Sequence, residues 1–251
     1  APAINWDKPF SGRRAMVAGA SRGIGLAIAQ VLARDGAHVV CVDVPQALPS
    51  LEQAASSVGG KAWALDITGA DAQQQLQAYV AEHGAFDVVV HNAGITRDKT
   101  IAKMTETAWR SVLAVNLEAP LQLSEALLQG QGLKAGGRIV CVSSISGIAG
   151  NLGQSNYATS KAGVIGLVQG LAPVAAAQQV TVNGVAPGFI ETQMTAKIPL
   201  MIREAGRRMN SLSQGGQPID VAETIAWLAH PASGGVNGQV VRVCGQSLLG
   251  A

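Results

Sequence analysis

The stretch AGASRGIGLAIA, residues 18–29, decides the fold. It follows a short apolar run and places Gly19, Gly23 and Gly25 in a turn that opens a segment of small and aliphatic residues. Glycines in such a turn allow a tight backbone path and the close approach of a pyrophosphate, which the free N–H groups at a helix start then stabilise. The spacing is GxxxGxG rather than the more familiar GxGxxG, and a glycine turn can also be purely structural. In this context it predicts a strand, a nucleotide-binding turn and a helix.

Short β-branched runs alternate with longer helical stretches along the rest of the chain. Because the expected strands are too apolar to face water, the pattern predicts a parallel sheet covered by helices on both faces. The fold class is therefore α/β, a single Rossmann-type doubly wound sheet of about seven strands. The expected strands are 14–18, 38–43, 62–65, 86–91, 138–143, 180–185 and 239–243, and the expected helices are 24–35, 70–82, 108–128, 157–178 and 221–229.

The composition bounds the class of protein. A length of 251 residues fits one such domain, and 48% hydrophobic residues with 30 glycines suit a well-buried core with tight turns. A net charge of +2 does not favour nucleic acid, and no apolar run nears the ~20 residues that span a membrane. Cys41, Cys141 and Cys244 lie in apolar runs without metal-ligand spacing. We expect no metal site, reduced core thiols and a cytoplasmic enzyme.

The domain boundaries follow from the same pattern. Residues 1–12 are expected to form an N-terminal extension and 13–251 the dinucleotide-binding domain, with a substrate lid at 189–216 after the sixth strand. The sequence begins with Ala rather than Met, so either the terminus is processed or a longer chain precedes it.

The second expected strand ends in an acid that bears on the choice of cofactor. Asp43 lies where a carboxylate accepts hydrogen bonds from both ribose hydroxyls of an adenosine, and it would repel a 2′-phosphate. Arg22 in the glycine turn points the other way, because a guanidinium there could bind that phosphate. No basic residue follows Asp43, so NAD(H) is favoured and NADP(H) is possible. Asp43 could also be an ordinary solvated acid at a strand end.

Two further strand ends fit the same ligand. LDIT places Asp66 and Ile67 where a carboxylate can hydrogen-bond an adenine amino group. HNAG, residues 91–94, ends the fourth strand with small residues over which a cofactor can slide. On its own, HNAG could also be an ordinary exit from a strand into a loop.

A hydroxyl, a phenol and an ammonium are expected to meet at the carboxyl edge of the sheet. The fifth strand delivers Ser143 and Ser144 to this edge. In SNYATSKAG, residues 155–163, Tyr157 and Lys161 are one helical turn apart and point from one face. A glycine-rich loop between the two segments is flexible enough to bring the helix start back beside the strand end.

This set suits proton transfer to a carbonyl group. A free tyrosine has a pKa near ~10, and a lysine cation within about 4–6 Å lowers that pKa. Tyr157 would protonate a carbonyl oxygen while hydride reaches the carbon, Ser144 would hydrogen-bond the same oxygen, and Lys161 would hold the nicotinamide ribose. Asn116 lies in the middle of an expected helix, where asparagine is unfavourable. It either supports a water-mediated proton path or caps a helix kink.

These motifs resemble the short-chain dehydrogenase/reductase family. The resemblance runs from Arg13 to Gly245 and rests on GASRGIG, HNAG, Asn116, the Ser144–Tyr157–Lys161 spacing and VAPGFIET. NAGITRDK, NLGQSNYATSKAG and VAPGFIETQMT are similar to the 3-oxoacyl-thioester (acyl-carrier-protein) reductase branch. That branch implies NAD(P)H-dependent reduction of a 3-oxoacyl thioester, carried by acyl carrier protein or coenzyme A, in fatty-acid biosynthesis.

The resemblance also completes the expected site. It implies that Pro187, Gly188, Ile190 and Thr192 surround the nicotinamide end. The catalytic set is then Ser144, Tyr157, Lys161 and Asn116. The expected cofactor-binding set is Gly19, Ser21, Arg22, Gly23, Ile24, Gly25, Asp43, Asp66, Ile67, Asn92, Ala93, Gly94, Tyr157, Lys161, Pro187, Gly188, Ile190 and Thr192.

The chain also departs from the family pattern. Ala18 replaces the usual threonine before the first glycine, which loses a hydroxyl that ties this turn to the neighbouring strand. His91 replaces the first asparagine of NNAG. Arginines that dock the acidic carrier elsewhere are few here, so a coenzyme A thioester stays open. This charge pattern and the missing Met resemble the C-terminal reductase half of the high-molecular-weight members of the branch.

The lid and the catalytic helix carry the remaining expectations. In the lid, Met194, Met201, Met209, Ile198 and Leu200 suggest an apolar acyl path, and Arg203, Arg207 and Arg208 could meet phosphates of a carrier. On the helix, small residues recur every four positions, at Ala158, Ala162, Gly166 and Gly170. They either pack on the sheet or admit a helix of a second copy. The resemblance implies that dimers and tetramers form through this helix and its long predecessor, so we expect a homodimer or homotetramer.

Two other functions stay open from the sequence. One is a dehydrogenase of a steroid, a sugar or another secondary alcohol on the same scaffold. The other is a cofactor-sensing binding protein without turnover, against which the intact Ser144, Tyr157 and Lys161 argue.

Overall fold

Seven parallel strands form one sheet in the computed structural model, which describes residues 4–193, 195–197 and 200–247. Their order across the sheet is β3-β2-β1-β4-β5-β6-β7. Strands β2 and β3 are therefore added on one side of β1, and β4 to β7 are added on its other side. The strands are β1 (Arg14–Ala18), β2 (His38–Asp43), β3 (Lys61–Ala64), β4 (Phe86–His91), β5 (Leu133–Val142), β6 (Thr181–Pro187) and β7 (Val240–Val243).

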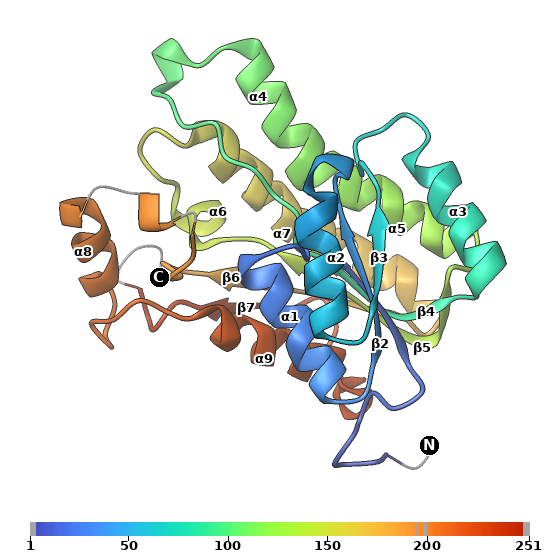
Figure 1. Cartoon of the computed structure of the whole chain (residues 1–251). Helices are drawn as coiled ribbons and strands as arrows, with labels where there is room; N and C mark the ends of the chain where they lie inside the picture. The colour runs from blue at the N-terminus through green and yellow to red at the C-terminus, as the bar shows by residue number, and fades with distance from the viewer. Residues whose placement is uncertain (1–3, 194, 198–199, 248–251) are drawn as a thin grey trace.

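Helices cover both faces of this sheet (Figure 1). On one face lie α1 (Gly23–Arg34), α2 (Leu48–Ser57) and α9 (Pro218–Ala229). On the other lie α3 (Ala72–His83), α5 (Ala119–Gln129) and α7 (Ser155–Ala176), with α4 (Glu106–Leu113) beside α7. Two short helices, α6 (Ile145–Ala149) and α8 (Leu200–Arg208), follow the carboxyl ends of β5 and β6. The predicted doubly wound α/β fold is confirmed.

Alternate side chains along the strands pack into two hydrophobic cores, one on each face of the sheet. In β4, Val88 and Val90 pack toward α1 and α9, whereas Val89 packs toward α3 and α5. All three are at most 1% exposed. Burying each of them contributes roughly 1.5–3 kcal/mol, which is why these strands read as continuous apolar runs.

The predicted boundaries of helices and strands agree best with the structure where the sequence pattern is simplest. β1, β2 and β4 match their predicted ranges, but β5 begins at Leu133, five residues earlier than the predicted 138. Its first half contains Gly136, with φ 79°, and its pairing with β4 shifts register after Phe86, so it does not look like a strand in the sequence. The predicted helix 108–128 is interrupted by a π-helical segment, Ala114–Glu118. The helices α2, α6 and α8 were not predicted.

The described part of the N-terminal extension packs onto the domain. Phe10 is fully buried, and its N–H donates to the carbonyl of Asp35 at 2.9 Å. Trp6 stacks on His230, with the ring centroids 5.7 Å apart. None of the helices in the described residues is long and apolar enough to cross a bilayer.

The three thiols differ in burial. Cys41 and Cys141 are fully buried, and burial raises the pKa of Cys41 to about 11 and that of Cys141 to about 12. Cys244 is only half-buried, because it lies just after β7, where its sulfur accepts the N–H of Ser247. The expectation of a core thiol is therefore wrong for Cys244. Within the described ranges, no three His, Cys, Asp or Glu side chains are grouped as metal ligands.

Candidate active site

A cleft of about 430 Å³ opens at the carboxyl edge of the sheet, and we call it the carboxyl-edge cleft. Of the site residues predicted from the sequence, all except Asn116 line it. Sequence reasoning missed several lining residues, although most of them are chain neighbours of predicted ones. Those missed are Val42, Val44, Leu65, Thr68, Ile95, Thr96, Val115, Val142, Gln193 and Thr195, together with Ser143, which had been placed only at the strand end.

The glycine turn is tight at two positions and open at the third. A Cβ on Gly25 would lie 1.9 Å from the carbonyl oxygen of Gly19, and one on Gly19 would lie 2.9 Å from the Cα of Ala93. Gly23 has φ 57°, and a Cβ there would meet only Thr192, at 3.9 Å. The N-cap residue of α1 makes no side-chain capping bond. The glycines leave the start of α1 without side chains at these three positions, and the free N–H groups of a first helical turn suit a pyrophosphate.

Asn92 braces this turn from the neighbouring strand. Its Nδ2 donates to the carbonyl oxygens of Ala18 and Gly19, at 3.1 Å each. In this chain the amide of Asn92 makes a tie between the turn and β4.

The end of β2 presents a carboxylate beside the glycine turn. Asp43 accepts the N–H of Ser21 at 3.3 Å on one oxygen and the N–H of Val44 at 2.9 Å on the other. Each carboxylate oxygen can accept a second hydrogen bond, so capacity remains for ribose hydroxyls. The Arg22 side chain is exposed, and none of the carboxylates in the described residues pairs with it. Asp66 is exposed at the end of β3, and one of its oxygens is held by Thr68.

Ser144, Tyr157 and Lys161 meet at the other end of the cleft. Ser144 caps α6 by accepting the N–H of Ser146 at 3.1 Å, and its hydroxyl hydrogen-bonds Tyr157. Lys161 is 3% exposed, and its Nζ donates to the carbonyl of Val142 at 2.7 Å. The neighbouring Ser143 donates to the carbonyl of Lys161 at 2.7 Å. One serine therefore fixes α7 to β5, while the other faces the phenol.

The protonation of Tyr157 differs from the expectation. Burial raises its pKa, and the hydrogen bond from Ser144 lowers it only in part. The Nζ of Lys161 donates to the carbonyl of Val142 and lies 5.7 Å from the centre of the Tyr157 ring. Burial also lowers the pKa of Lys161 to about 8. A net lowering of the Tyr157 pKa is therefore wrong for the chain alone, because burial outweighs it. A phenol that keeps its proton is suited to donate it.

Asn116 lies just behind the cleft surface in the π-helical segment. It is 1% exposed, its Nδ2 donates to the carbonyl of Ile95 and to Ser160 at 3.0 Å each, and its Oδ1 accepts the N–H of Ile95. Both donors are used, so only Oδ1 can accept another bond, for example from water. Such π-helical bulges are frequent at functional sites. The structure thus shows an irregular helix at Asn116, and the water-mediated proton path stays a prediction.

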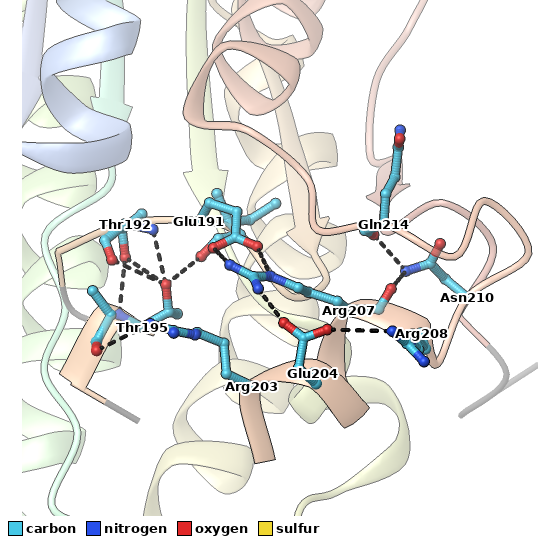
Figure 2. Close-up of polar contacts among 11 residues, drawn as sticks. Glu191, Thr192, Thr195, Arg203, Glu204, Arg207, Arg208, Asn210 and Gln214 are labelled. Atoms are coloured by element: carbon cyan, nitrogen blue, oxygen red, sulfur yellow. Dashed lines mark hydrogen bonds and ion pairs between the residues drawn. The ribbon is translucent and has the colours of Figure 1, made fainter. Parts of the chain in front are cut away.

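The lid differs most from what the sequence suggested. Met201 is 82% and Leu200 59% exposed, so neither forms an apolar path in the cleft, and Met209 is also exposed. Met194 and Ile198 lie outside the described residues. Of the three lid arginines, Arg207 is held by Glu191 and Glu204, and Arg208 lies 3.7 Å from Glu204 (Figure 2).

Small residues on α7 form an outward face. Ala162, Gly166 and Gly170 are exposed, and a Cβ added at either glycine would meet no atom within 4 Å. Ala158 is half-buried. The alternative that this row packs on the sheet is therefore wrong for the three exposed positions.

A glycine turn and a hydroxyl–phenol–ammonium set at the carboxyl edge of a doubly wound sheet define a nicotinamide-dependent oxidoreductase. The model of the family described as enoyl-(acyl carrier protein) reductase matches residues 19–245. The 3-oxoacyl-(acyl-carrier-protein) reductase FabG of Vibrio cholerae is 40% identical over 237 residues, which cover 94% of this chain and 97% of the relative. FabG of Thermotoga maritima is 40% identical over 240 residues, covering 94% and 98%, and FabG of Escherichia coli is 37% identical over 237, covering 94% and 97%. The chain belongs to the short-chain dehydrogenase/reductase family.

Proposed function

We propose that this chain reduces a 3-oxoacyl thioester to the 3-hydroxyacyl thioester with a nicotinamide dinucleotide, as in fatty-acid biosynthesis. The observation that carries the proposal is the convergence of Ser144, Tyr157 and Lys161 at one end of a cleft whose other end is a glycine turn. Relatives named for this activity are 36–40% identical over most of their length.

The cleft fits the cofactor by its own geometry. A Cβ at Gly19 or Gly25 would clash with the turn itself or with the residues after β4, and the tight backbone path that results supports the close approach of a dinucleotide. The glycine turn would hold the pyrophosphate, Asp43 and Asp66 the adenosine end, and Gly94, Pro187, Gly188, Ile190 and Thr192 the nicotinamide end. When bound, the reduced nicotinamide supplies a hydride to the carbonyl carbon.

The protein supplies the proton and the positioning. Tyr157 donates its phenolic proton to the carbonyl oxygen of the substrate as that oxygen gains electrons. Ser144, which already hydrogen-bonds the phenol, donates to the same oxygen and stabilises the charge that develops there. Lys161 keeps the start of α7 fixed to the end of β5, and Asn116 holds the loop after β4 behind it.

NAD(H) is the proposed cofactor, and NADP(H) is the alternative. Asp43 lines the cleft where the adenosine ribose would lie, whereas Arg22 is an exposed guanidinium that could bind a 2′-phosphate. Asp43→Ala should reduce the ratio of NADH to NADPH activity, since it removes both the acceptor and the repulsion. Asp66→Ala, at the adenine end, is the matched control and should leave the ratio unchanged. An unaltered ratio in Asp43→Ala would assign the preference to another residue.

The carrier, the assembly and the compartment belong to the same proposal. An acyl chain on coenzyme A or on acyl carrier protein is the substrate, and the exposed small-residue face of α7 supports a homodimer or homotetramer. Free thiols at Cys41, Cys141 and Cys244 support a cytoplasmic location. Sedimentation velocity of the wild type and of Gly166→Leu, which places a bulky side chain on that face, tests the assembly.

The decisive experiment is steady-state reduction of acetoacetyl-CoA with NADH and NADPH in parallel. Crotonyl-CoA, an enoyl thioester, and a simple ketone, the oxidised form of a secondary alcohol, serve as competing substrates. Tyr157→Phe should abolish reduction while leaving NADH binding near the wild-type value. Preference for crotonyl-CoA would identify an enoyl reductase, and preference for the ketone would identify a dehydrogenase of another secondary alcohol. Binding of NADH without turnover of any substrate would identify a sensor.

A further inference from the structure

Three lid side chains join in one bidentate arrangement outside the cleft (Figure 2). Arg207, in the last turn of α8, donates from Nε to one oxygen of Glu191 and from Nη2 to the other at 3.0 Å. Its Nη1 donates to Glu204. Three nitrogen atoms of one guanidinium therefore donate hydrogen bonds to two carboxylates. Arg can form this planar arrangement and Lys cannot.

The Glu191 side chain packs closely against the segment that precedes α9. A Cβ on Gly215 would lie 2.4 Å from a Glu191 oxygen, so only glycine leaves room there. The N–H of Glu191 donates to the carbonyl of Gly216 at 2.8 Å, and the N–H of Gly216 donates to the carbonyl of Phe189 at 2.9 Å. The segment after β6, the segment before α9 and the helix α8 thus meet at one side chain.

Residues on both sides of Glu191 line the carboxyl-edge cleft. Ile190 is 4% exposed, and Thr192 follows directly. The hydroxyl of Thr195 accepts the N–H of Thr192 at 2.8 Å and lies 2.8 Å from the carbonyl of Ile190 (Figure 2). Because Glu191 lies between these two residues in the chain, contacts that fix its side chain also limit how far this part of the cleft wall can shift.

Arg207 is also fixed at its own backbone. The Nδ2 of Asn210 donates to the carbonyl of Arg207 at 3.1 Å and to that of Gln214 at 2.9 Å, and Asn210 is 8% exposed. An exposed ion pair is ordinarily worth little. The side chains of Arg207 and Glu191 are only 31% and 24% exposed, and both ends of the pair are anchored.

We propose that Arg207 is a positioning residue that acts through Glu191 to hold Ile190 and Thr192 against the nicotinamide end of the dinucleotide. It touches neither cofactor nor substrate and sets how tightly the cofactor is kept. This inference rests on the proposed function only in its choice of ligand. The chain thus uses at least one of the three lid arginines to shape the cofactor wall and not to bind a carrier phosphate.

The test compares two neighbouring arginines. Arg207→Ala should weaken NADH binding about tenfold, the equivalent of one lost charge-assisted contact, while kcat at saturating NADH changes less than about twofold. Arg208→Ala removes the same charge from a side chain that is 75% exposed and should bind NADH like the wild type. Arg207→Lys should recover only part of the affinity, because it keeps the charge but not the fork.

A second variant guards against misfolding and against a purely structural effect. Glu191→Gln is isosteric and should weaken NADH binding as Arg207→Ala does, and the double variant should be no worse than either single one. Equal affinity in the Arg207 and Arg208 variants would overturn the proposal. The proposal would also be overturned if variants that leave Glu191 and Arg207 unchanged, but have the same thermal stability as Arg207→Ala, lost as much affinity for NADH. NADH binding by fluorescence needs no turnover, so failure to reduce acetoacetyl-CoA would reject the proposed function and leave this test intact.

Discussion

The two walls of the carboxyl-edge cleft are built in different ways. The glycine turn is held by backbone contacts and by one amide, that of Asn92, which bonds two carbonyl oxygens. The lid wall is held by long charged side chains, with Arg207 joining two carboxylates (Figure 2). Backbone contacts leave no room for adjustment, whereas a salt-bridged wall can be loosened by changing one side chain. We therefore expect that the proposed adenosine end is fixed with the fold and that the proposed nicotinamide end can be tuned separately.

Alanine at Gly25 would disrupt the wall formed by the glycine turn, which we call the rigid wall, and should have the largest effect. A Cβ there would lie 1.9 Å from the carbonyl oxygen of Gly19, so the turn or α1 must move. We expect a loss of stability of more than about 4 kcal/mol, measured by urea unfolding, and no detectable NADH binding. Gly235→Ala, where a Cβ meets no atom within 4 Å, is the control and should be near neutral. Retained NADH binding in Gly25→Ala would show that this wall is adjustable after all.

A buried imidazole beneath the rigid wall predicts acid sensitivity. His91 is 4% exposed and lies 2.9 Å from the hydroxyl of Ser124, and burial lowers its pKa from 6.5 to about 4. Between these values the unfolded chain binds the proton and the folded chain does not, so stability falls as the pH falls from 6.5 toward 4. His91→Gln should reduce the stability difference between pH 7 and pH 4 by about 3 kcal/mol, measured by urea unfolding.

The control for this prediction is His38→Gln, which removes an exposed imidazole from the start of β2. If His91→Gln kept the full acid dependence, the loss of stability would have to come from carboxylates elsewhere. His91 would then have no part in the acid sensitivity of the fold.

Lys161 stands where the two walls meet, and its cation is costly to bury. Burial lowers its pKa from 10.5 to about 8, so the full cost is present below pH 8 and is relieved as the pH rises toward 10.5. Lys161→Met removes this cost but also loses the hydrogen bond to Val142, so we expect a net gain of about 2 kcal/mol at pH 7. The same variant should lose reductase activity. A loss of stability instead would show that the ammonium is well solvated inside the fold.

The fold and the rigid wall were predictable because their determinants are local. Parallel strands are short apolar runs, and Gly19, Gly23 and Gly25 mark a turn whose geometry depends on residues close in the chain. Tyr157 and Lys161 could be placed together because one helical turn separates them. The glycine turn needed no knowledge of distant segments, apart from Asn92, whose bracing bonds span 73 and 74 residues.

The lid could not be predicted for the opposite reason. Glu191 and Arg207 are 16 residues apart, and nothing in the sequence says which of three arginines meets which carboxylate. The methionines suggested an acyl path, but Met201 is almost fully exposed, because helical spacing alone does not reveal which face of α8 turns to the protein. The raised pKa of Tyr157 was missed for a related reason, since the burial that raises it arises only in the folded chain.

The smallest expected effect lies in the lid wall and sharpens the comparison. Thr195→Val keeps the shape of the side chain but removes the hydroxyl that accepts the N–H of Thr192 at 2.8 Å. A half-buried donor left without its partner costs about 1 kcal/mol, so NADH should bind roughly fivefold more weakly while global stability changes little. Thr195→Ser keeps the hydroxyl and should bind like the wild type. If Thr195→Val lowered the unfolding free energy by as much as Gly25→Ala, the lid wall would be as much a part of the fold as the glycine turn, and the distinction between the two walls would fail.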